Sequence, residues 1–179
     1  MANTKEPKLE LAKKTLPKPL LRAIEHVFSQ NIKGAALVGG TALAGFYAGH
    51  RRSDDMDVFT DSDSSFRASV LSIKNLRDAQ LTNENRSDHY YHASCSYQDH
   101  VFQIDIVHDP NLFRVGTFFT LKNGIITASL ETLLRMKTAT LVSRCSEKDL
   151  YDLIWLFENF QKPPTHELIL LGQSIDAGV

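Results

Sequence analysis

AALVGG at residues 35–40 and DMDVF at residues 55–59 are the stretches that decide the fold. The first is a short apolar run that stops at two glycines, and it predicts a buried strand followed by a short helix at 41–48. The second alternates polar and apolar residues, which is typical of a strand with one buried face. These stretches therefore predict two strands of one sheet with a short helix between them.

The elements predicted on both sides of these strands complete an α+β fold. One helix precedes them at 20–30 and another follows at 62–73. A two-residue turn at 98–99 joins two β-favouring runs into a hairpin. We therefore expect a mixed sheet flanked by helices, with a small helical C-terminal part. The remaining expected elements are strands at 89–97, 101–107, 118–121 and 125–126, and helices at 129–142, at 147–160 and near 171.

The chain divides into three expected parts, which are a basic N-terminal arm at 1–19, a core at 20–128 and a helical part at 129–179 packed on that core. A solvated arm is the simpler interpretation of the basic residues near the N-terminus, and contact with a phosphate backbone is the alternative. These residues are Lys5, Lys8, Lys13, Lys14, Lys18 and Arg22.

Composition favours a soluble, cytoplasmic protein. The 179 residues are 42% apolar and 23% charged, and the net charge of −1 argues against a general polyanion binder. Cys95 and Cys145 form no disulfide or zinc motif, which indicates a reducing compartment. Neither a signal-peptide core nor a run of ~18 apolar residues is present, so we expect no membrane association.

Asp55 and Asp57 are the first candidate site residues. Because side chains two positions apart on a strand point the same way, these carboxylates project together while Met56 and Val58 enter the core. Neighbouring carboxylates repel each other unless a cation lies between them. The pair therefore predicts a site for Mg²⁺ or Mn²⁺, with a solvent-facing strand that binds no metal as the alternative.

Two further features favour a site that handles phosphates. Gly39 and Gly40 lie between a strand and a helix, where glycine lets backbone N–H groups approach a phosphate. Asp105 is a lone carboxylate in an otherwise apolar strand, which is costly unless the group is paired or bound to metal. If its strand neighbours that of Asp55 and Asp57, three carboxylates converge and two metal ions fit between them.

Two motifs resemble those of the nucleotidyltransferase AbiEii/AbiGii toxin family. VGGTALA at 38–44 and GHRRSDDMDVF at 49–59 are similar to its first motif, GGTAL followed by HRxSxDxD. Lys137, Arg144, the pair KD at 148–149 and Asp152 resemble its later motif of a Lys, an Arg and KDxxD. The resemblance implies a nucleotidyltransferase-like sheet and metal-dependent transfer of a nucleoside monophosphate from a nucleoside triphosphate.

The resemblance also implies roles for individual residues. The catalytic set is Asp55, Asp57, Asp105, Lys148 and Asp149, of which the first three would also hold the metal. The nucleotide-binding set is Gly39, Gly40, Thr41, Arg51, Ser53, Lys137 and Arg144. Asp149 and Asp152 would orient the cations or activate the acceptor. The histidines at 50, 89, 92, 100 and 108 are interpreted as bystanders.

The basic residues of the later motif depend on an unbroken helix. At 100° per residue, Lys137, Arg144 and Lys148 would form one stripe, on which Lys137 is an exposed charge that contributes little to stability. A helix break at 143–146 would disrupt this stripe. A solvated helix face is the alternative interpretation.

The acceptor and the partners follow from the resemblance alone. It implies RNA, in particular a tRNA end, as the acceptor, and an antitoxin protein that neutralises the enzyme. Two alternatives remain: the same chemistry on a small molecule or a protein, which the near-neutral charge favours, and a non-catalytic nucleotide-binding module. Three retained carboxylates that repel one another argue against the non-catalytic module.

Overall fold

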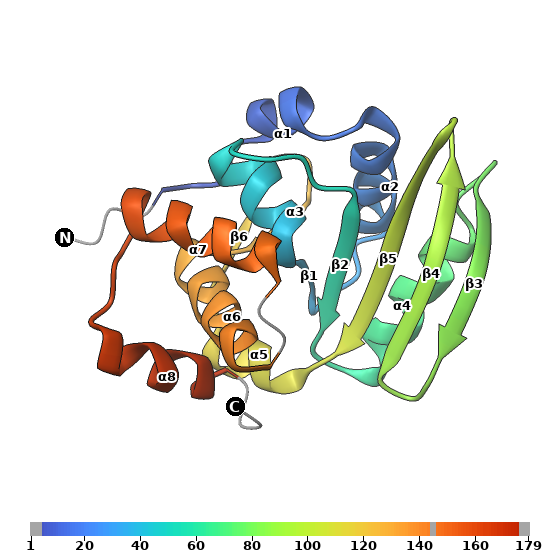
Figure 1. Cartoon of the computed structure of the whole chain (residues 1–179). Coiled ribbons are helices and arrows are strands. Elements are labelled where there is room, and N and C mark those ends of the chain that lie inside the picture. The colour runs from blue at the N-terminus through green and yellow to red at the C-terminus, as the bar shows by residue number, and fades with distance from the viewer. Residues whose placement is uncertain (1–4, 144–145, 176–179) are drawn as a thin grey trace.

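A computed structural model describes residues 5–143 and 146–175 (Figure 1). The first half of the chain forms α1 (Leu9–Thr15), α2 (Lys18–Ser29), β1 (Ala35–Leu37), α3 (Gly39–Leu43), the π-helical turn η1 (Ala44–Ala48), β2 (Asp55–Thr60), α4 (Asp63–Lys74) and β3 (Gln80–Arg86). The second half forms β4 (Tyr90–Tyr97), β5 (His100–His108), α5 (Pro110–Val115), β6 (Phe118–Thr120), β7 (Ile126–Ala128), α6 (Leu130–Ser143), α7 (Glu147–Asn159) and α8 (Thr165–Gln173).

The strands form one mixed sheet of seven strands in the order β3-β4-β5-β2-β1-β7-β6. β2 runs parallel to β5 and antiparallel to β1, and β1 runs parallel to β7. β4 and β5 form the predicted hairpin, whose turn residues Gln98 and Asp99 both have positive φ. Such a turn matches the natural twist of a hairpin and fixes which residues face each other across it.

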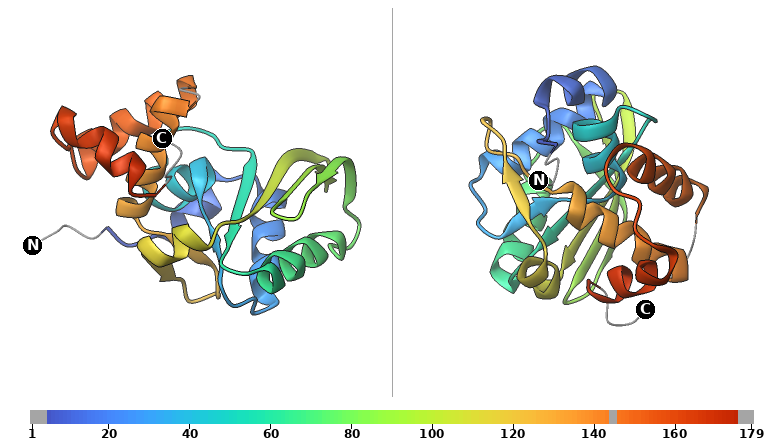
Figure 2. Two further views of the ribbon diagram at one scale, coloured as in Figure 1. Left: turned by 90° about the horizontal axis from the view of Figure 1, so that it is seen from below. Right: turned by 90° about the vertical axis from the view of Figure 1, so that its left-hand side faces the viewer.

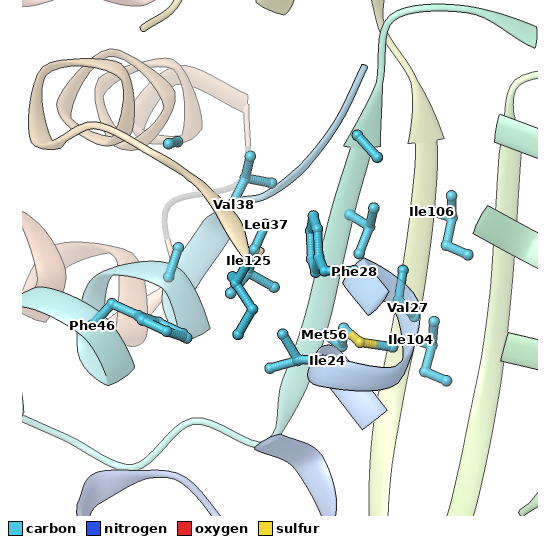
Figure 3. Packing of buried hydrophobic residues seen from close by; sticks show 14 of the residues in the cluster. Ile24, Val27, Phe28, Leu37, Val38, Phe46, Met56, Ile104, Ile106 and Ile125 are labelled. Carbon is cyan, nitrogen blue, oxygen red and sulfur yellow. The ribbon is translucent and has the colours of Figure 1, made fainter. Parts of the chain in front are cut away.

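One face of the sheet is buried under helices. α2 packs on β5, and α4 packs on β2 and β5. In the left view of Figure 2, α4 lies below the strands. The buried alternate residues of β2 and β5 meet the apolar side of α2 in the core, as Figure 3 shows for Met56, Ile104, Ile106, Ile24 and Val27. Burial of these alternate positions leaves the intervening residues of each strand on the opposite face.

The C-terminal helices form a second group beside the sheet. α6 contacts α3, α7 and α8, and α7 also contacts α3 (Figure 1). The predicted break between α6 and α7 is present, because α6 ends at Ser143 and α7 begins at Glu147. The expected α+β class with a helical C-terminal part is confirmed, whereas the division of the chain at residues 19 and 128 stays a prediction.

Three elements were not expected from the sequence. α1 lies within the arm that was expected to be solvated, but its residue Ala12 and the following Leu16 are buried. The Leu16 side chain packs against Gly45, in the space that a side chain at that position would occupy. α5 begins at Pro110 after Asp109, whose side chain accepts a hydrogen bond from the Leu112 amide. β3 is an edge strand. Most of its residues are exposed, so it lacks the alternation that identifies a half-buried strand.

Within the described part of the chain, every helix is too short or too polar to span a membrane.

Candidate active site

The three candidate carboxylates lie on two neighbouring parallel strands. Asp57 of β2 is directly opposite Asp105 of β5, and Asp55 is opposite Gln103. All three aspartates line one cleft of about 970 Å³, together with Gly39 and Gly40. The predicted convergence on one face of the sheet is therefore present, because β2 and β5 are neighbours and their buried residues point the other way.

The two glycines are needed because side chains from β2 and the loop before it approach their backbone. Gly39 has φ +69°, and a Cβ at that position would lie 2.1 Å from Asp57 Oδ2. At Gly40 a Cβ would lie 2.3 Å from Nη2 of Arg51. Each glycine therefore leaves space for a charged group of the cleft, which accounts for two glycines where a tight turn needs one.

Gly39→Ala should lower both stability and activity. A side chain at positive φ costs about 1–2 kcal/mol, and the added methyl group displaces the Asp57 carboxylate. Gly124→Ala is the matched control, since Gly124 also has positive φ but its Cβ would meet only the Phe28 carbonyl oxygen, 3.9 Å away. Thermal melts should show a lower Tm for both variants, and transfer assays should show lost activity only for Gly39→Ala. Equal activities would mean that the glycine serves the turn alone.

Thr41 and Ser53 connect the glycine turn to β2. Both residues are buried, and they are absent from the residues that line the cleft. The Thr41 hydroxyl donates to the Asp55 carbonyl oxygen, and Thr41 Oγ1 lies 2.8 Å from Ser53 Oγ. In this structure the two hydroxyls hold the turn against the strand and do not face a ligand.

Lys148 and Arg51 supply positive charge at the cleft. Lys148 Nζ lies 3.7 Å from Asp55 Oδ2, and its side chain is 67% exposed. Arg51 lines the same cleft, but its guanidinium makes two hydrogen bonds to Asp152, from Nε at 2.7 Å and from Nη2 at 2.8 Å. Lys148 is therefore the more accessible of these two cations.

A buried ion cluster joins the loop before β2 to helices α6 and α7. We use this name for His50, Arg51, Lys137, Asp149 and Asp152. Lys137 Nζ lies 2.7 Å from Asp149 Oδ1 and 2.7 Å from Asp152 Oδ2, while His50 Nε2 lies 2.9 Å from Asp152 Oδ1. The expectation that Lys137 is an exposed charge is wrong, because its side chain is only 7% exposed. The helix break places Lys137 and Lys148 on different helices, so they share no stripe.

The pKa values of this cluster indicate that its charges stabilise one another. Burial pushes the pKa of the Asp152 carboxyl upward, but hydrogen bonds from Arg51, His50 and Lys137 outweigh it and hold this pKa well below its usual range. Burial likewise lowers the pKa of the Arg51 guanidinium, and the hydrogen bond and charge of Asp152 raise it above its ordinary value. Asp152 is therefore ionised at neutral pH and paired with cations.

Asp149 has a second task at the start of α7. Its backbone N–H donates to the Ser146 hydroxyl, and its own carboxylate accepts from the backbone N–H and the hydroxyl of Ser146. This capping box fixes the first turn of α7, where Lys148 also lies. Arg144, the remaining residue of the predicted nucleotide-binding set, lies outside the described residues.

Asp105 has two partners on β4 that sequence reasoning missed. Tyr90 donates its hydroxyl hydrogen to Asp105 Oδ1 at 2.5 Å, and His92 Nδ1 lies 3.0 Å from the same oxygen. Burial, together with the hydrogen bond to Asp105 and the charge of its carboxylate, raises the pKa of the Tyr90 hydroxyl to about 12, so Tyr90 stays protonated and donates. One sequence signal was available: the turn at 98–99 sets the register that places residue 92 opposite residue 105.

The fit of the site to magnesium rests on Asp55 and Asp57. Within residues 5–143 and 146–175, no three His, Cys, Asp or Glu side chains are close enough together to hold one metal ion. Asp105 bonds to Tyr90 and His92, so its expected role as a third metal ligand beside Asp55 and Asp57 stays a prediction. Magnesium commonly takes one or two carboxylates with phosphate oxygens and water, so the β2 pair, which lines the cleft, fits it.

Acidic residues beside a glycine turn, with cations at the rim, suit the transfer of a phosphoryl group from a nucleotide, and the chain is a nucleotidyltransferase. The family model described as "Nucleotidyl transferase AbiEii toxin, Type IV TA system" matches residues 20–173. The chain therefore belongs to the AbiEii family of nucleotidyl transferase toxins from type IV toxin–antitoxin systems.

Solved structures share this fold at low sequence identity. A putative nucleotidyltransferase from Helicobacter pylori has a TM-score of 0.58 at 19% identity, over 91% of this chain and 74% of that chain. The nucleotidyltransferase toxin MenT4 of Mycobacterium tuberculosis has a TM-score of 0.59 at 15% identity, over 89% and 65%. The Megavirus polyadenylate synthase has a TM-score of 0.53 at 15% identity, over 87% and 34%. The chain matches no curated protein sequence.

Proposed function

We propose that this enzyme transfers a nucleoside monophosphate from a nucleoside triphosphate to a hydroxyl group of RNA, with a tRNA end as the acceptor. The observation that carries the proposal is the register of β2 and β5, which puts Asp57 beside Asp105, with Asp55 in the same cleft as Gly39 and Gly40. RNA as the acceptor, and an antitoxin that neutralises the enzyme, are proposed because the chain belongs to a family of toxins from toxin–antitoxin systems.

The triphosphate would bind between the glycine turn and the first turn of α7. Gly39 and Gly40 have no side chains of their own, and the groups that lie against them are the Asp57 carboxylate and the Arg51 guanidinium, so a phosphate bound there would lie beside the Arg51 cation and any metal held by Asp57. Lys148 lies at the same end of the cleft, beside Asp55, where it would contact the β- and γ-phosphates. Arg51 and Lys137 would act through their fixed charges, since both are held by Asp152.

The carboxylates would serve the two ends of the displacement. Asp55 and Asp57 would hold Mg²⁺ or Mn²⁺, which supplies charge neutralisation at the α-phosphate and at the leaving pyrophosphate. Asp105, fixed by Tyr90 and His92, would accept the proton of the attacking hydroxyl or complete the metal site once substrates are bound. Asp149 would act indirectly, by orienting Lys137 and the start of α7.

Incubation of the purified protein with each α-labelled nucleoside triphosphate, magnesium and total RNA tests this function. We expect label to enter RNA from one or a few of the four triphosphates, and the labelled RNA to run with tRNA on a denaturing gel. Label in small molecules or protein would assign a different acceptor. The absence of any transfer, with nucleotide binding retained, would point to a nucleotide-binding module.

Lys148→Ala should weaken binding of the triphosphate without unfolding the protein. The side chain is exposed, so its loss has little effect on stability, and loss of one phosphate contact should raise the donor KM about tenfold. Lys122→Ala is the control, because Lys122 is also exposed but does not line the cleft. An unchanged donor KM for Lys148→Ala would remove Lys148 from the phosphate site.

A further inference from the structure

The face of the sheet that carries the carboxylates forms one wall of the cleft and continues along β4. Asp105, Gln103, Tyr90 and His92 line the cleft on this face, and Ser94 follows them on β4, while the alternate residues of both strands are buried under α2 and α4. In Figure 1 this face is the near side of β5, β4 and β3, and α4 lies behind it. Tyr90 and His92 therefore line the side of the cleft that is formed by β4.

Charge is distributed unequally on the two sides of the carboxylates. On the side of α7 lie Lys148, Arg51 and Lys137, all of which line the cleft. On the side of β4 lie hydroxyl, amide and imidazole groups, with Ser94 Oγ donating to Gln103 Oε1 at 2.9 Å and Tyr90 and His92 at Asp105. β4 and β5 contain no Lys or Arg. Arg86 of β3 points to the opposite face, where it lies over the Phe66 ring.

This asymmetry distinguishes the side of the site that would bind the nucleoside triphosphate from the side on which the accepting hydroxyl group would approach. In phosphoryl transfer the attacking and leaving oxygens lie roughly in line on opposite sides of the phosphorus atom. The leaving pyrophosphate carries the larger negative charge and belongs on the side of the cations. The attacking hydroxyl group must then approach over β5 and β4, past Asp105.

The chemistry of that approach suits unpaired nucleosides. The Tyr90 and His92 rings are nearly parallel, with centroids 6.4 Å apart and an interplanar angle of 15°, and Tyr90 is 38% exposed. Proteins recognise single-stranded RNA by stacking unpaired bases on such rings and by hydrogen bonds to base edges. A surface without cations offers little to the phosphate backbone of a duplex.

We propose that the open face of β4 and β5 binds the unpaired 3′ end of the RNA acceptor, with its terminal bases stacked at Tyr90 and His92. This inference rests on the proposed function and adds where, and in which conformation, the acceptor binds.

The test compares Tyr90→Phe with Tyr90→Leu. Both variants lose the hydrogen bond to Asp105, but only Tyr90→Phe keeps an aromatic ring. We expect kcat to fall to a similar extent in both variants, with an unchanged KM for the nucleoside triphosphate. The KM for the RNA acceptor should rise roughly 5- to 100-fold in Tyr90→Leu alone. If Phe and Leu give the same acceptor KM, Tyr90 only positions Asp105 and the stacking proposal is wrong.

A binding measurement keeps this test separate from the test of transfer. A fluorescent single-stranded oligoribonucleotide should bind the parent and Tyr90→Phe within about twofold of each other, and Tyr90→Leu roughly 5- to 100-fold more weakly. Ser94→Asp should also weaken binding severalfold, because it adds negative charge to the face, whereas Ser64→Asp on the outside of α4 should not. Tighter binding of a blunt duplex, or binding unaffected at both positions, would overturn the inference. Binding of the oligoribonucleotide without any transfer of a nucleoside monophosphate to RNA would count against the proposed function instead.

Discussion

Asp57→Asn should lower kcat by roughly 10³-fold or more and leave the protein folded. The substitution keeps the shape of the side chain but removes a negative charge from the pair on β2, where a cation would stabilise the transition state. Asp57 lines the cleft, and buried Met56 and Val58 anchor its strand, so we expect the fold to survive the substitution.

Thermal melts with and without magnesium test the Asp57 prediction apart from activity. A ligand that binds only the folded state adds RT ln(1 + [L]/Kd) to stability, so magnesium should raise the Tm of the parent and not that of Asp57→Asn. Asp78→Asn is the control, since Asp78 is highly exposed on a turn and should keep both the magnesium shift and the activity. If Asp57→Asn unfolds the protein, the carboxylate is structural and the metal site must be sought elsewhere.

Asp152→Ala should destabilise the protein by about 3–5 kcal/mol, the usual cost of removing one partner from a buried ion pair. The Asp152 side chain is fully buried and pairs with Arg51, Lys137 and His50. Its loss leaves Arg51 and Lys137 with buried positive charge and fewer acceptors. Urea unfolding should show a large decrease in the free energy of unfolding.

A surface pair provides the comparison for Asp152. Asp63 and Arg67 form an exposed i,i+4 pair on α4, and Asp63→Ala should cost about 0.5 kcal/mol or less. A cost below about 1 kcal/mol for Asp152→Ala would mean that water reaches the cluster. Activity measured well below the unfolding midpoint should also fall in Asp152→Ala, because Arg51 loses the partner that holds it at the cleft.

The pH dependence of the same cluster has a definite sign. The pKa of Asp152 is lower in the folded state than in the unfolded chain, where an aspartate titrates near ~3.9. Its contribution to stability is therefore complete above that pH and is lost as pH falls toward the folded pKa. Acid unfolding of the parent should show this loss only below about pH 4, and the stability of an Asp152→Asn variant should change less over that range.

The sequence predicted the β2 pair and its relation to Asp105 because strand alternation is a local rule. Asp55 and Asp57 must share a face wherever the strand lies. Asp105 lies in an otherwise apolar strand, where a carboxylate is costly unless it is paired with a polar or charged group. Burial of Lys137 was not predictable in this way. It depends on how α6, which ends at Ser143, packs against α7, which begins at Glu147, and thus on contacts between two helices that neither helix defines alone.

The roles of Tyr90 and His92 were missed for a different reason. Histidine occurs often on strands without a function, so His92 alone predicts nothing. The turn at 98–99 places His92 opposite Asp105, and this relation becomes visible only when the residues of the two strands are paired across the hairpin. α1 was not predicted because its apolar side is short and lies among several basic residues. β3 was not predicted because most of its residues are exposed.

The buried ion cluster also sets an order of events during protein synthesis. Arg51 is synthesised before its partner Asp152, which is 101 residues further along the chain. Until α6 and α7 have been made, a nascent chain has the carboxylates of β2 and β5 without the groups that fix Arg51 and place Lys148. The groups that fix Arg51 and place Lys148 therefore join the carboxylates only after α7 has been synthesised.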